Sequence, residues 1–465
     1  MNRPNILWLC TDQQRWDTIH ALGNDKIRTP NIDRLVLGGV SCLNTYCQST
    51  ICTPSRASFL TGMYSSTIHA CGNGNERWME GAPLVTKLLA DTGYTCGLSG
   101  KLHLSGCCDR IEPRPEDDGY SVYHWAHSHL DGWPEGNAYA DWVKEKGVIL
   151  GDMYDEKGYM PPELHQTTFC ADKAIEFMEE ERDEPWLMSV NIFDPHEPFD
   201  PPPEYRDRYK PEDVPEPFYR EGDIETQAGL IEADFQTPPR HPDEFKTREK
   251  IAAYYAMIEL VDDNIGRMMA ALERTGQLEN TLVILHSDHG EILGDHGLLL
   301  KGCRFYEGLV HVPLIFYWKG VLPENRRVDA LVELTDIAPT LLDYAGVAGA
   351  ENMAGRSLRP LLEGATDTHR ESVRCEYYHA LSATTPGREE WYGTYATMIR
   401  DPRYKLITYH GTGKGELFDL QEDPREFDNL WNDPAHAETR FRLVLESFDQ
   451  TAFAVDLGSA QTLNY

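Results

Sequence analysis

The chain has 465 residues, and its 76 acidic and 43 basic side chains give a formal charge of −33. A surface this acidic repels nucleic acid and anionic membranes, so both are poor candidates as partners. Hydrophobic residues make up 41% of the chain, which is enough to fill a sizeable core. The length predicts one large domain with a smaller one, and any anionic substrate would need a local basic pocket.

The beginning of the chain shows no leader pattern. Met1 to Pro4 runs directly into the apolar segment Asn5 to Cys10, without the charged region, long apolar core and cleavage site of a signal peptide. The 11 cysteines are odd in number and lack CxxC spacing, which argues against a zinc module. The longest apolar stretches, such as Val312 to Trp318, are too short to cross a bilayer. We therefore expect a cytoplasmic protein with reduced thiols; a chain trimmed of its signal peptide would look the same.

Several apolar runs of strand length are each followed at once by polar side chains that could act in catalysis. In chain order these runs are Ile6 to Cys10, Tyr94 to Ser99, Trp186 to Phe193 and Thr281 to His286. Ligands of an open α/β sheet bind beyond the carboxyl ends of its parallel strands. We therefore expect the loops that follow these runs to meet at one site.

Helices are predicted between the strands. Apolar residues at helical spacing indicate helices over Pro83 to Asp91, Thr168 to Glu181, Thr247 to Arg274 and Thr335 to Ala345. The run from Asp200 to Phe245 is rich in proline and acid, and indicates a long surface excursion with little regular structure. The predicted fold of residues 1–370 is an α/β domain with a large mixed, mostly parallel sheet flanked by helices.

The pattern changes after about Glu371. Short strands are indicated at Thr397 to Ile399, Tyr404 to Thr408 and Glu416 to Asp419, followed by a final helix near Ala435 to Phe453. Residues 371–465 are therefore predicted to form a smaller α+β domain that carries a short antiparallel sheet.

The most specific motif is the segment Cys52-Thr53-Pro54-Ser55-Arg56. Thr53 can cap a helix whose first position is Pro54, which would place Cys52 just before the positive end of that helix. Such a location suits an anion and lowers the pKa of a thiol. Taken alone, the motif leaves two interpretations open, a reactive cysteine and a merely buried one.

These five residues match the C-x-P-S-R signature of the type I sulfatases, a family of the alkaline-phosphatase-like superfamily. Several other segments match that family in the right order, so the chain resembles it over most of its length. They are Asn5-Ile6-Leu7 to Asp12-Gln13-Gln14; Gly93-Tyr94-Thr95 to Gly100-Lys101-Leu102-His103; Asp194 to Phe199; Ser287 to Glu291, Gly294 to Gly297 and Lys301; and Glu416 to Leu420 with Asp423-Pro424 and Asn429-Leu430.

The resemblance implies a hydrolase, a sulfatase that releases inorganic sulfate from a sulfated saccharide or another small sulfate ester. It implies that a separate formylglycine-generating enzyme oxidises Cys52 to formylglycine, whose hydrate attacks sulfur in line. The family's usual cation is calcium, and magnesium is also compatible with hard oxygen ligands. The ligands that the resemblance implies are Asp12, Gln13, Asp288 and His289, together with the modified Cys52; Gln13 could contact the anion instead.

Further roles follow from charge and from the matched motifs. Arg56, Lys101 and Lys301 can neutralise negative charge on the sulfuryl oxygens and on the leaving oxygen. By resemblance, His103 would take the proton whose loss releases sulfate. His196 would protonate the leaving alcohol, alone or together with Lys301.

Three residues are candidate substrate contacts. Asn73 could bind a sulfuryl oxygen, although a turn explains this residue equally well. Trp125 and His127 belong to a segment rich in groups that stack on sugars or form hydrogen bonds to them. Core packing and surface loops explain both residues nearly as well.

Two other functions stay open. A phosphonate monoester or phosphodiester hydrolase with the same formylglycine is compatible with Gln13 and Asn73, although the loop Gly100 to His103 has the sulfatase form. A non-catalytic relative that binds sugar or metal is disfavoured, because nucleophile, cation ligands, acid/base histidines and basic clamps are all present. A hydrolase that uses unmodified Cys52 leaves Asp12 and Asp288 unexplained. The oligomeric state is not predicted.

Overall fold

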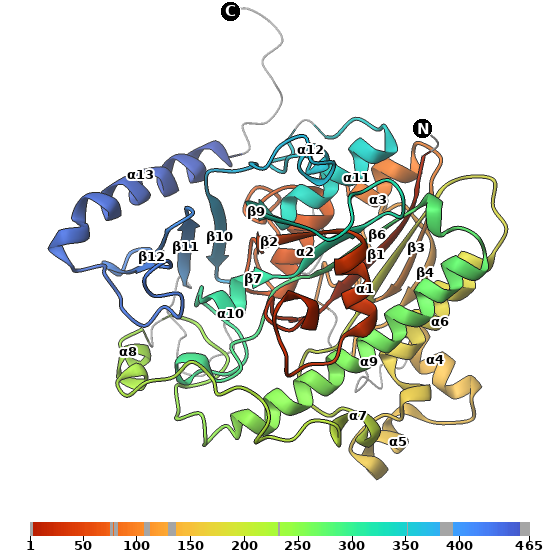
Figure 1. Cartoon of the computed structure of the whole chain (residues 1–465), viewed down its shortest axis with the longest axis horizontal. Helices are drawn as coiled ribbons and strands as arrows, with labels where there is room; N and C mark the ends of the chain where they lie inside the picture. Colours follow the sequence, from red (N-terminus) through yellow and green to blue (C-terminus); the bar gives the residue numbers. More distant parts are fainter. Residues whose placement is uncertain are drawn as a thin grey trace, which may run out of the picture.

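A computed structural model describes residues 3–74, 78, 82–106, 112–128, 136–230, 233–350, 352–381 and 394–455. At its centre lies a 9-stranded mixed sheet in the order β4-β3-β5-β1-β6-β8-β2-β7, with β9 also paired to β2 (Figure 1). The strands are β1 (Asn5–Thr11), β2 (Val40–Tyr46), β3 (Thr95–Gly100), β4 (Tyr120–Trp125), β5 (Trp186–Ile192), β6 (Thr281–Ser287), β7 (His311–Val312), β8 (Leu314–Tyr317) and β9 (Arg326–Glu333).

The predicted apolar runs form the parallel centre of this sheet. Strand β1 pairs in parallel with β5 on one side and β6 on the other, and β3 pairs in parallel with β5. All residues of β1, β5 and β6 are buried, as is usual for parallel strands covered on both faces. Their carboxyl ends therefore lie at one edge of the sheet, as the sequence predicts.

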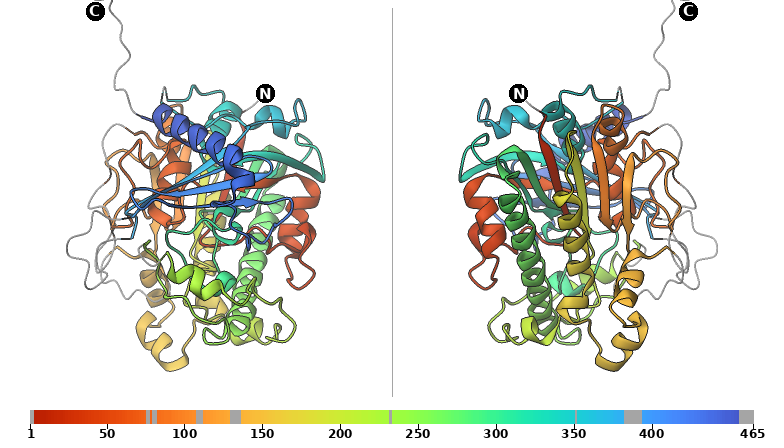
Figure 2. Two further views of the ribbon diagram at one scale, coloured as in Figure 1. Left: turned by 90° about the vertical axis from the view of Figure 1, so that its left-hand side faces the viewer. Right: turned by 90° about the vertical axis from the view of Figure 1, so that its right-hand side faces the viewer.

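Helices cover both faces of the sheet. Alternate residues of β1 point to opposite faces, so Ile6 and Trp8 belong to one hydrophobic cluster and Leu7 and Leu9 to another. Helices α2, α3 and α11 pack on the first face, and α1, α6 and α9 on the second (Figure 2). The helices are α1 (Pro30–Gly38), α2 (Cys52–Thr61), α3 (Val85–Ala90), α4 (Ala138–Glu145), α5 (Leu150–Lys157), α6 (Gln166–Glu179), α7 (Pro203–Arg206), α8 (Asp223–Ala228), α9 (Thr247–Arg274), α10 (Glu307–Val310), α11 (Ile337–Ala345), α12 (Arg359–Leu362) and α13 (Ala437–Phe453).

A second, 4-stranded sheet follows in the C-terminal region and is antiparallel, as predicted. Its strands are β10 (Val373–Tyr378), β11 (Tyr395–Arg400), β12 (Tyr404–Tyr409) and β13 (Lys414–Asp419). Helix α13 packs across this sheet through the buried Leu443 (Figure 2). The backbone N–H of Glu376 on β10 donates to the carbonyl of Gln48 at 2.9 Å, so the two sheets are joined. A division of the chain at residue 370 stays a prediction.

Most of the helices expected from the sequence are present. Helix α9 spans the whole predicted range, and α3, α6 and α11 lie within two residues of theirs. The segment from Asp200 to Phe245 holds only the short helices α7 and α8 in its described part. Among the described helices, none is both long and apolar enough for a membrane span.

Candidate active site

The loops that follow β1, β3, β5 and β6 meet, and backbone hydrogen bonds tie them together. The N–H of Asp12 donates to the carbonyl of Asp194 at 3.4 Å, and the N–H of Asp288 donates to the carbonyl of Thr11 at 3.2 Å. The N–H of Lys101 donates to the carbonyl of Asn191 at 2.9 Å. The convergence expected from the sequence is therefore present.

Cys52 is the first residue of α2, a helix whose residues are all buried. The predicted cap of this helix is wrong, because Thr53 lies within the first turn and its Oγ1 has no hydrogen-bond partner among the described residues. Asn73 takes the capping role instead, since its Oδ1 accepts the N–H of Thr53 at 3.2 Å. Asn73 thus lies close to Cys52; a contact between Asn73 and a substrate stays a prediction.

Cys52 forms a compact cluster with Asp12, Asp288 and His289. One potential ligand atom from each residue lies within 4.8 Å of the others, and all four side chains are buried. The Cys52 Sγ lies 3.2 Å from His289 Nε2 and 3.8 Å from Asp12 Oδ1. Ca²⁺ binds oxygen ligands at about 2.3–2.6 Å, so ligands on opposite sides of one ion are roughly 5 Å apart. The spacing and the hard carboxylate donors fit a single divalent cation.

Arg56 holds the two carboxylates of this cluster in place. Its Nε donates to Asp288 Oδ2 at 2.9 Å, and one terminal nitrogen donates to Asp12 Oδ2 at 3.3 Å. The other terminal nitrogen donates to the carbonyl of Lys101 at 2.9 Å. Each nitrogen of the guanidinium thus contacts a protein group. Arg56 thus supports the two carboxylates, and its predicted contact with the anion stays a prediction.

Lys301 lies between Cys52 and two other predicted site residues. Its Nζ is 3.1 Å from the Cys52 Sγ, 2.7 Å from Gln13 Oε1 and 2.9 Å from His196 Nε2. The Lys101 ammonium lies nearby and donates to Asp12 Oδ2. Two ammonium groups therefore lie near the Cys52 thiol.

Two glutamates complete the surroundings of Gln13 and were not predicted from the sequence. The side-chain amide of Gln13 donates to Glu197 Oε2 at 2.9 Å and to Glu291 Oε2. Burial, together with the neighbouring Glu197, raises the pKa of Glu291 to about 7. Both glutamates belong to matched segments of the sequence, so their closeness to predicted site residues was the available signal. Both the nitrogen and the oxygen of the Gln13 side-chain amide thus form hydrogen bonds with other side chains. The role of Gln13 as a cation ligand stays a prediction.

The charges around Cys52 favour its anionic form. Burial alone raises the pKa of this thiol, but the ammonium groups of Lys101 and Lys301 and the imidazole of His289 outweigh it and lower the pKa well below its usual range. Burial and the nearby Lys101 lower the pKa of His103 to about 3, although the neighbouring Cys52 acts in the opposite direction. His103 is therefore neutral beside Cys52, and its role as a base stays a prediction.

The loop that carries His103 is held by a buried carboxylate. Glu112 accepts hydrogen bonds from the backbone N–H of His103 at 2.7 Å, of Leu104, and of Ser105 at 3.2 Å. It also accepts from Trp125 Nε1 at 3.0 Å. These contacts fix a loop in which His103 adopts a positive φ of 54°. No pattern in the sequence points to Glu112, because its partners are mostly backbone groups.

The two aromatic candidates for substrate contact differ in their placement. Trp125 is 1% exposed, so its ring offers no face to a sugar and supports Glu112 instead. The His127 ring lies 5.0 Å from that of His103 in an edge-to-face arrangement. His127 is thus beside the predicted base, and substrate contact by this residue stays a prediction.

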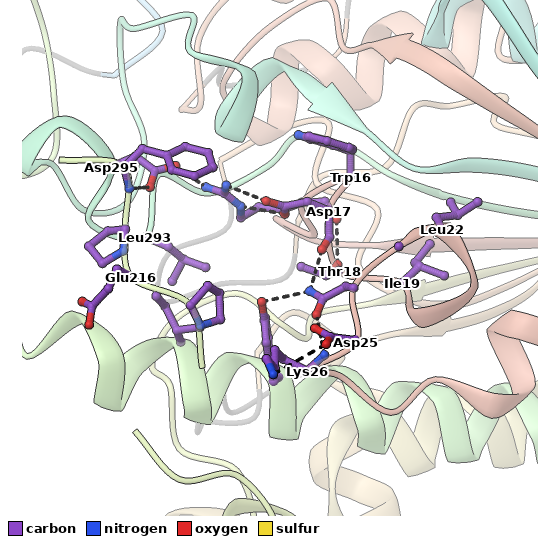
Figure 3. Close-up of a pocket in the computed structure, with 18 residues that line it drawn as sticks. Trp16, Asp17, Thr18, Ile19, Leu22, Asp25, Lys26, Glu216, Leu293 and Asp295 are labelled. Carbon is purple, nitrogen blue, oxygen red and sulfur yellow. Dashed lines mark hydrogen bonds and ion pairs between the residues drawn. The ribbon is translucent and has the colours of Figure 1, made fainter. Parts of the chain in front are cut away.

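A separate cavity of about 380 Å³ lies behind the loop that follows β1 (Figure 3). Trp16, Ile19, Leu22 and Leu293 contribute to its apolar lining. At one end Arg15 forms ion pairs with Asp17 and Asp295, both at 2.8 Å. None of the predicted catalytic residues lines this cavity, so it is distinct from the candidate active site.

Fold and site together define a class of protein. A mostly parallel α/β sheet carries, at the carboxyl edge of its strands, a buried cysteine beside two carboxylates, two lysines and three histidines. This arrangement is typical of hydrolases that cleave the esters of tetrahedral oxyacids with the help of a cation.

Comparison with known proteins identifies the family. The sulfatase family matches residues 4–347, and the family described as N-sulphoglucosamine sulphohydrolase, C-terminal, matches residues 294–451. The chain is 29% identical to an arylsulfatase of Clostridium perfringens, over 94% of this chain and 92% of that relative. It is 28% identical to an N-acetylglucosamine-6-O-sulfatase of Bacteroides thetaiotaomicron, over 95% of this chain and 85% of that relative.

Among solved structures, the phosphonate monoester hydrolase of Agrobacterium radiobacter has a similar fold, with a TM-score of 0.83 and 26% identity. The similarity covers 98% of this chain and 96% of that one. The chain belongs to the sulfatase family and has the fold of the alkaline-phosphatase-like superfamily.

Proposed function

We propose that this protein is a formylglycine-dependent sulfatase that uses calcium to release sulfate from a sulfated saccharide or another small sulfate ester. The observation that carries the proposal is the placement of Cys52, which lies within one cluster with Asp12, Asp288 and His289 and is contacted by the Lys301 ammonium. A formylglycine-generating enzyme would convert Cys52 to formylglycine, whose hydrate supplies an oxygen nucleophile.

Asp12, Asp288 and His289, with Gln13 or residue 52, would hold the cation, which draws charge from the sulfuryl group and from the nucleophile. Arg56 keeps the two carboxylates aimed at one point through its hydrogen bonds to both. The lysines on either side supply positive charge that neutralises an anionic ester without any movement of the site.

The chain's own groups can also move the required protons. Nδ1 of His196 lies 2.7 Å from the carbonyl of Glu197, which can only accept, so the ring proton is on Nδ1. Nε2 then accepts from Lys301 at 2.9 Å. The Lys301–His196 pair would thus protonate the leaving alcohol, and the transferred proton would come from the Lys301 ammonium. His103, neutral and close to residue 52, would accept the proton whose loss releases sulfate.

The named substrates of two relatives support the proposed substrate class. One relative is an arylsulfatase and another an N-acetylglucosamine-6-O-sulfatase. Both names describe sulfate esters of small alcohols, one aromatic and one a sugar.

Hydrolysis of phosphonate monoesters is the second candidate. It is favoured by the close structural similarity to a phosphonate monoester hydrolase. This similarity covers more than nine-tenths of both chains. The two candidates share nucleophile and cation, so the reacting centre alone does not separate them.

The test compares an aryl sulfate, an aryl phosphonate monoester and an aryl phosphodiester with one common leaving group. The protein would be co-expressed with a formylglycine-generating enzyme, and Cys52→Ala would serve as the blank. We expect release of sulfate with a kcat/KM at least about tenfold above that for either phosphorus ester, a difference of about 1.4 kcal/mol in transition-state stabilisation. A preference for a phosphorus ester would establish the second candidate instead.

A further inference from the structure

A second cavity, of about 940 Å³, begins directly beside the candidate active site. Glu197 lines it, and the carboxylate of Glu197 contacts both His196, at 3.1 Å, and Gln13, at 2.9 Å. Leu300, which precedes Lys301, lines the same cavity. The cavity therefore opens next to the two groups that would protonate the leaving alcohol.

The exposure of the side chains also indicates that the site opens towards this cavity. Cys52 is 1% exposed, whereas the side chains of His196 and Glu197 are 15% and 26% exposed. An ester whose sulfur lies at Cys52 would thus extend its alcohol portion past His196 and Glu197. The lining residues Phe199, Ala252, Ala253 and Leu299 give the cavity an apolar wall on which the C–H face of a sugar can pack.

The charges of this cavity do not balance. Four basic side chains line it but only three acidic ones. Asp207 pairs with Arg206 at 3.3 Å and Glu249 with Lys246 at 3.7 Å, while Glu197 accepts a hydrogen bond from Gln13 at 2.9 Å.

Two further lysines, Lys210 and Lys250, also line the cavity, and neither forms an ion pair with any described residue. Lys250 lies 5.8 Å above the ring centre of Phe199, within the cavity wall, and is half-buried. Excess positive charge is notable in a chain whose formal charge is −33, because the overall field repels anions. Both ammonium groups can therefore pair with an anionic group of a ligand that occupies this cavity.

We propose that this cavity binds the alcohol portion of the substrate, and that Lys210 and Lys250 select alcohols carrying a second anionic group, a carboxylate or another sulfate. This inference rests on the proposed sulfatase function and narrows it to polyanionic saccharides. A cationic alcohol is disfavoured, since basic side chains outnumber acidic ones in the lining. A neutral alcohol would leave both ammonium groups unused.

The test uses two ligands that differ by one charge. One is a monosulfated disaccharide whose neighbouring unit is a uronic acid, and the other is the methyl ester of the same uronic acid. Binding to Cys52→Ala protein is measured by titration calorimetry, so neither conversion of Cys52 nor turnover is needed. Lys210→Gln, Lys250→Gln and their double variant are compared in that background. Lys246→Gln is the matched control, because it removes the same charge from the same cavity but from a paired lysine.

We expect the free acid to bind at least about tenfold more tightly than its methyl ester, as for a charge-assisted contact. The double variant should lose most of this preference, Lys246→Gln should lose no more than about twofold, and 0.5 M NaCl should reduce the preference by screening. Equal binding of the two ligands, binding of neither, or a preference that survives in the double variant would overturn the inference. Failure of the proposed function would be recognised separately, as absence of sulfate release by converted wild-type protein whose binding preference is intact.

Discussion

The buried carboxylate of Glu112 positions the loop that carries His103, and it does so through hydrogen bonds to the backbone. It accepts from three consecutive backbone N–H groups, those of His103, Leu104 and Ser105, and from the indole of Trp125. Burial raises the pKa of Glu112 even though all these donors favour its charged form. These hydrogen bonds therefore stabilise the loop in which His103 has a positive φ.

The substitution Glu112→Gln tests this role. One carboxylate oxygen becomes an NH₂ group, which cannot accept and would face backbone donors. We expect unfolding free energy to fall by about 2–3 kcal/mol and kcat to fall more strongly than KM rises, because His103 is displaced. Denaturant titration and steady-state kinetics measure the two effects. Glu116→Gln, an exposed acid of the same segment, is the control, and equal kinetics for the two variants would contradict the positioning role.

The residues of the site could be predicted from the sequence when they lie directly after a strand or at the start of a helix. Asp12, Lys101, His196 and Asp288 follow the predicted strands closely, and the structure brings their loops together. The contact of Trp125 with Glu112 joins groups that no periodicity connects. The capping of α2 by Asn73 depends on a similar contact between distant positions.

At the scale of secondary structure, the close pairing of β3 and β5 places the Lys101–His103 loop. The last residue of β3 is Gly100, with a φ of +98°, and a Cβ at this position would lie 2.0 Å from the carbonyl oxygen of Asn191 on β5. A side chain would therefore clash with backbone and strain the turn that leads to Lys101. The parallel pairing itself was predictable from buried apolar runs, whereas this close approach was not.

Gly100→Ala should destabilise the protein by about 3 kcal/mol or more, since an unfavourable φ and a steric clash add together. The matched control is Gly151→Ala in α5, where a Cβ meets nothing within 4 Å. There we expect a gain of about 0.5–1 kcal/mol, because alanine favours the helix. Thermal or denaturant unfolding of both variants gives the comparison. A Gly100→Ala protein as stable as wild type would show that β3 and β5 are not packed this closely.

At the scale of the whole molecule, the protein combines an acidic surface with buried positive charge. The chain carries a formal charge of −33, yet Arg56, Lys101 and Lys301 are at most 2% exposed and surround Cys52. Buried cations are costly unless they are paired. Asp12 and Asp288 pair with Arg56 and Lys101, whereas the Lys301 ammonium contacts Gln13 Oε1 and the Cys52 Sγ. The fold thus concentrates at one edge of the sheet the charge that an anionic ester requires.

The overall architecture was largely predictable, because buried parallel strands and amphipathic helices leave strong patterns in the sequence. The ranges of β1, β6 and α9 agree closely with those expected. Strand β10 was not among the predicted strands; its placement depends on pairing with β11 and on contact with the large sheet. Contacts of this kind are set by the assembled molecule and leave no local pattern.

The central claim is that residue 52, once converted to formylglycine, is the nucleophile of a sulfatase. The most direct test measures the rate of sulfate release, in the presence of calcium, in preparations that differ in the fraction of Cys52 converted. Peptide mass gives that fraction, and the rate is plotted against it. We predict a straight line through the origin, with no activity in protein whose Cys52 is an intact thiol. Equal activity in converted and unconverted protein would contradict the account.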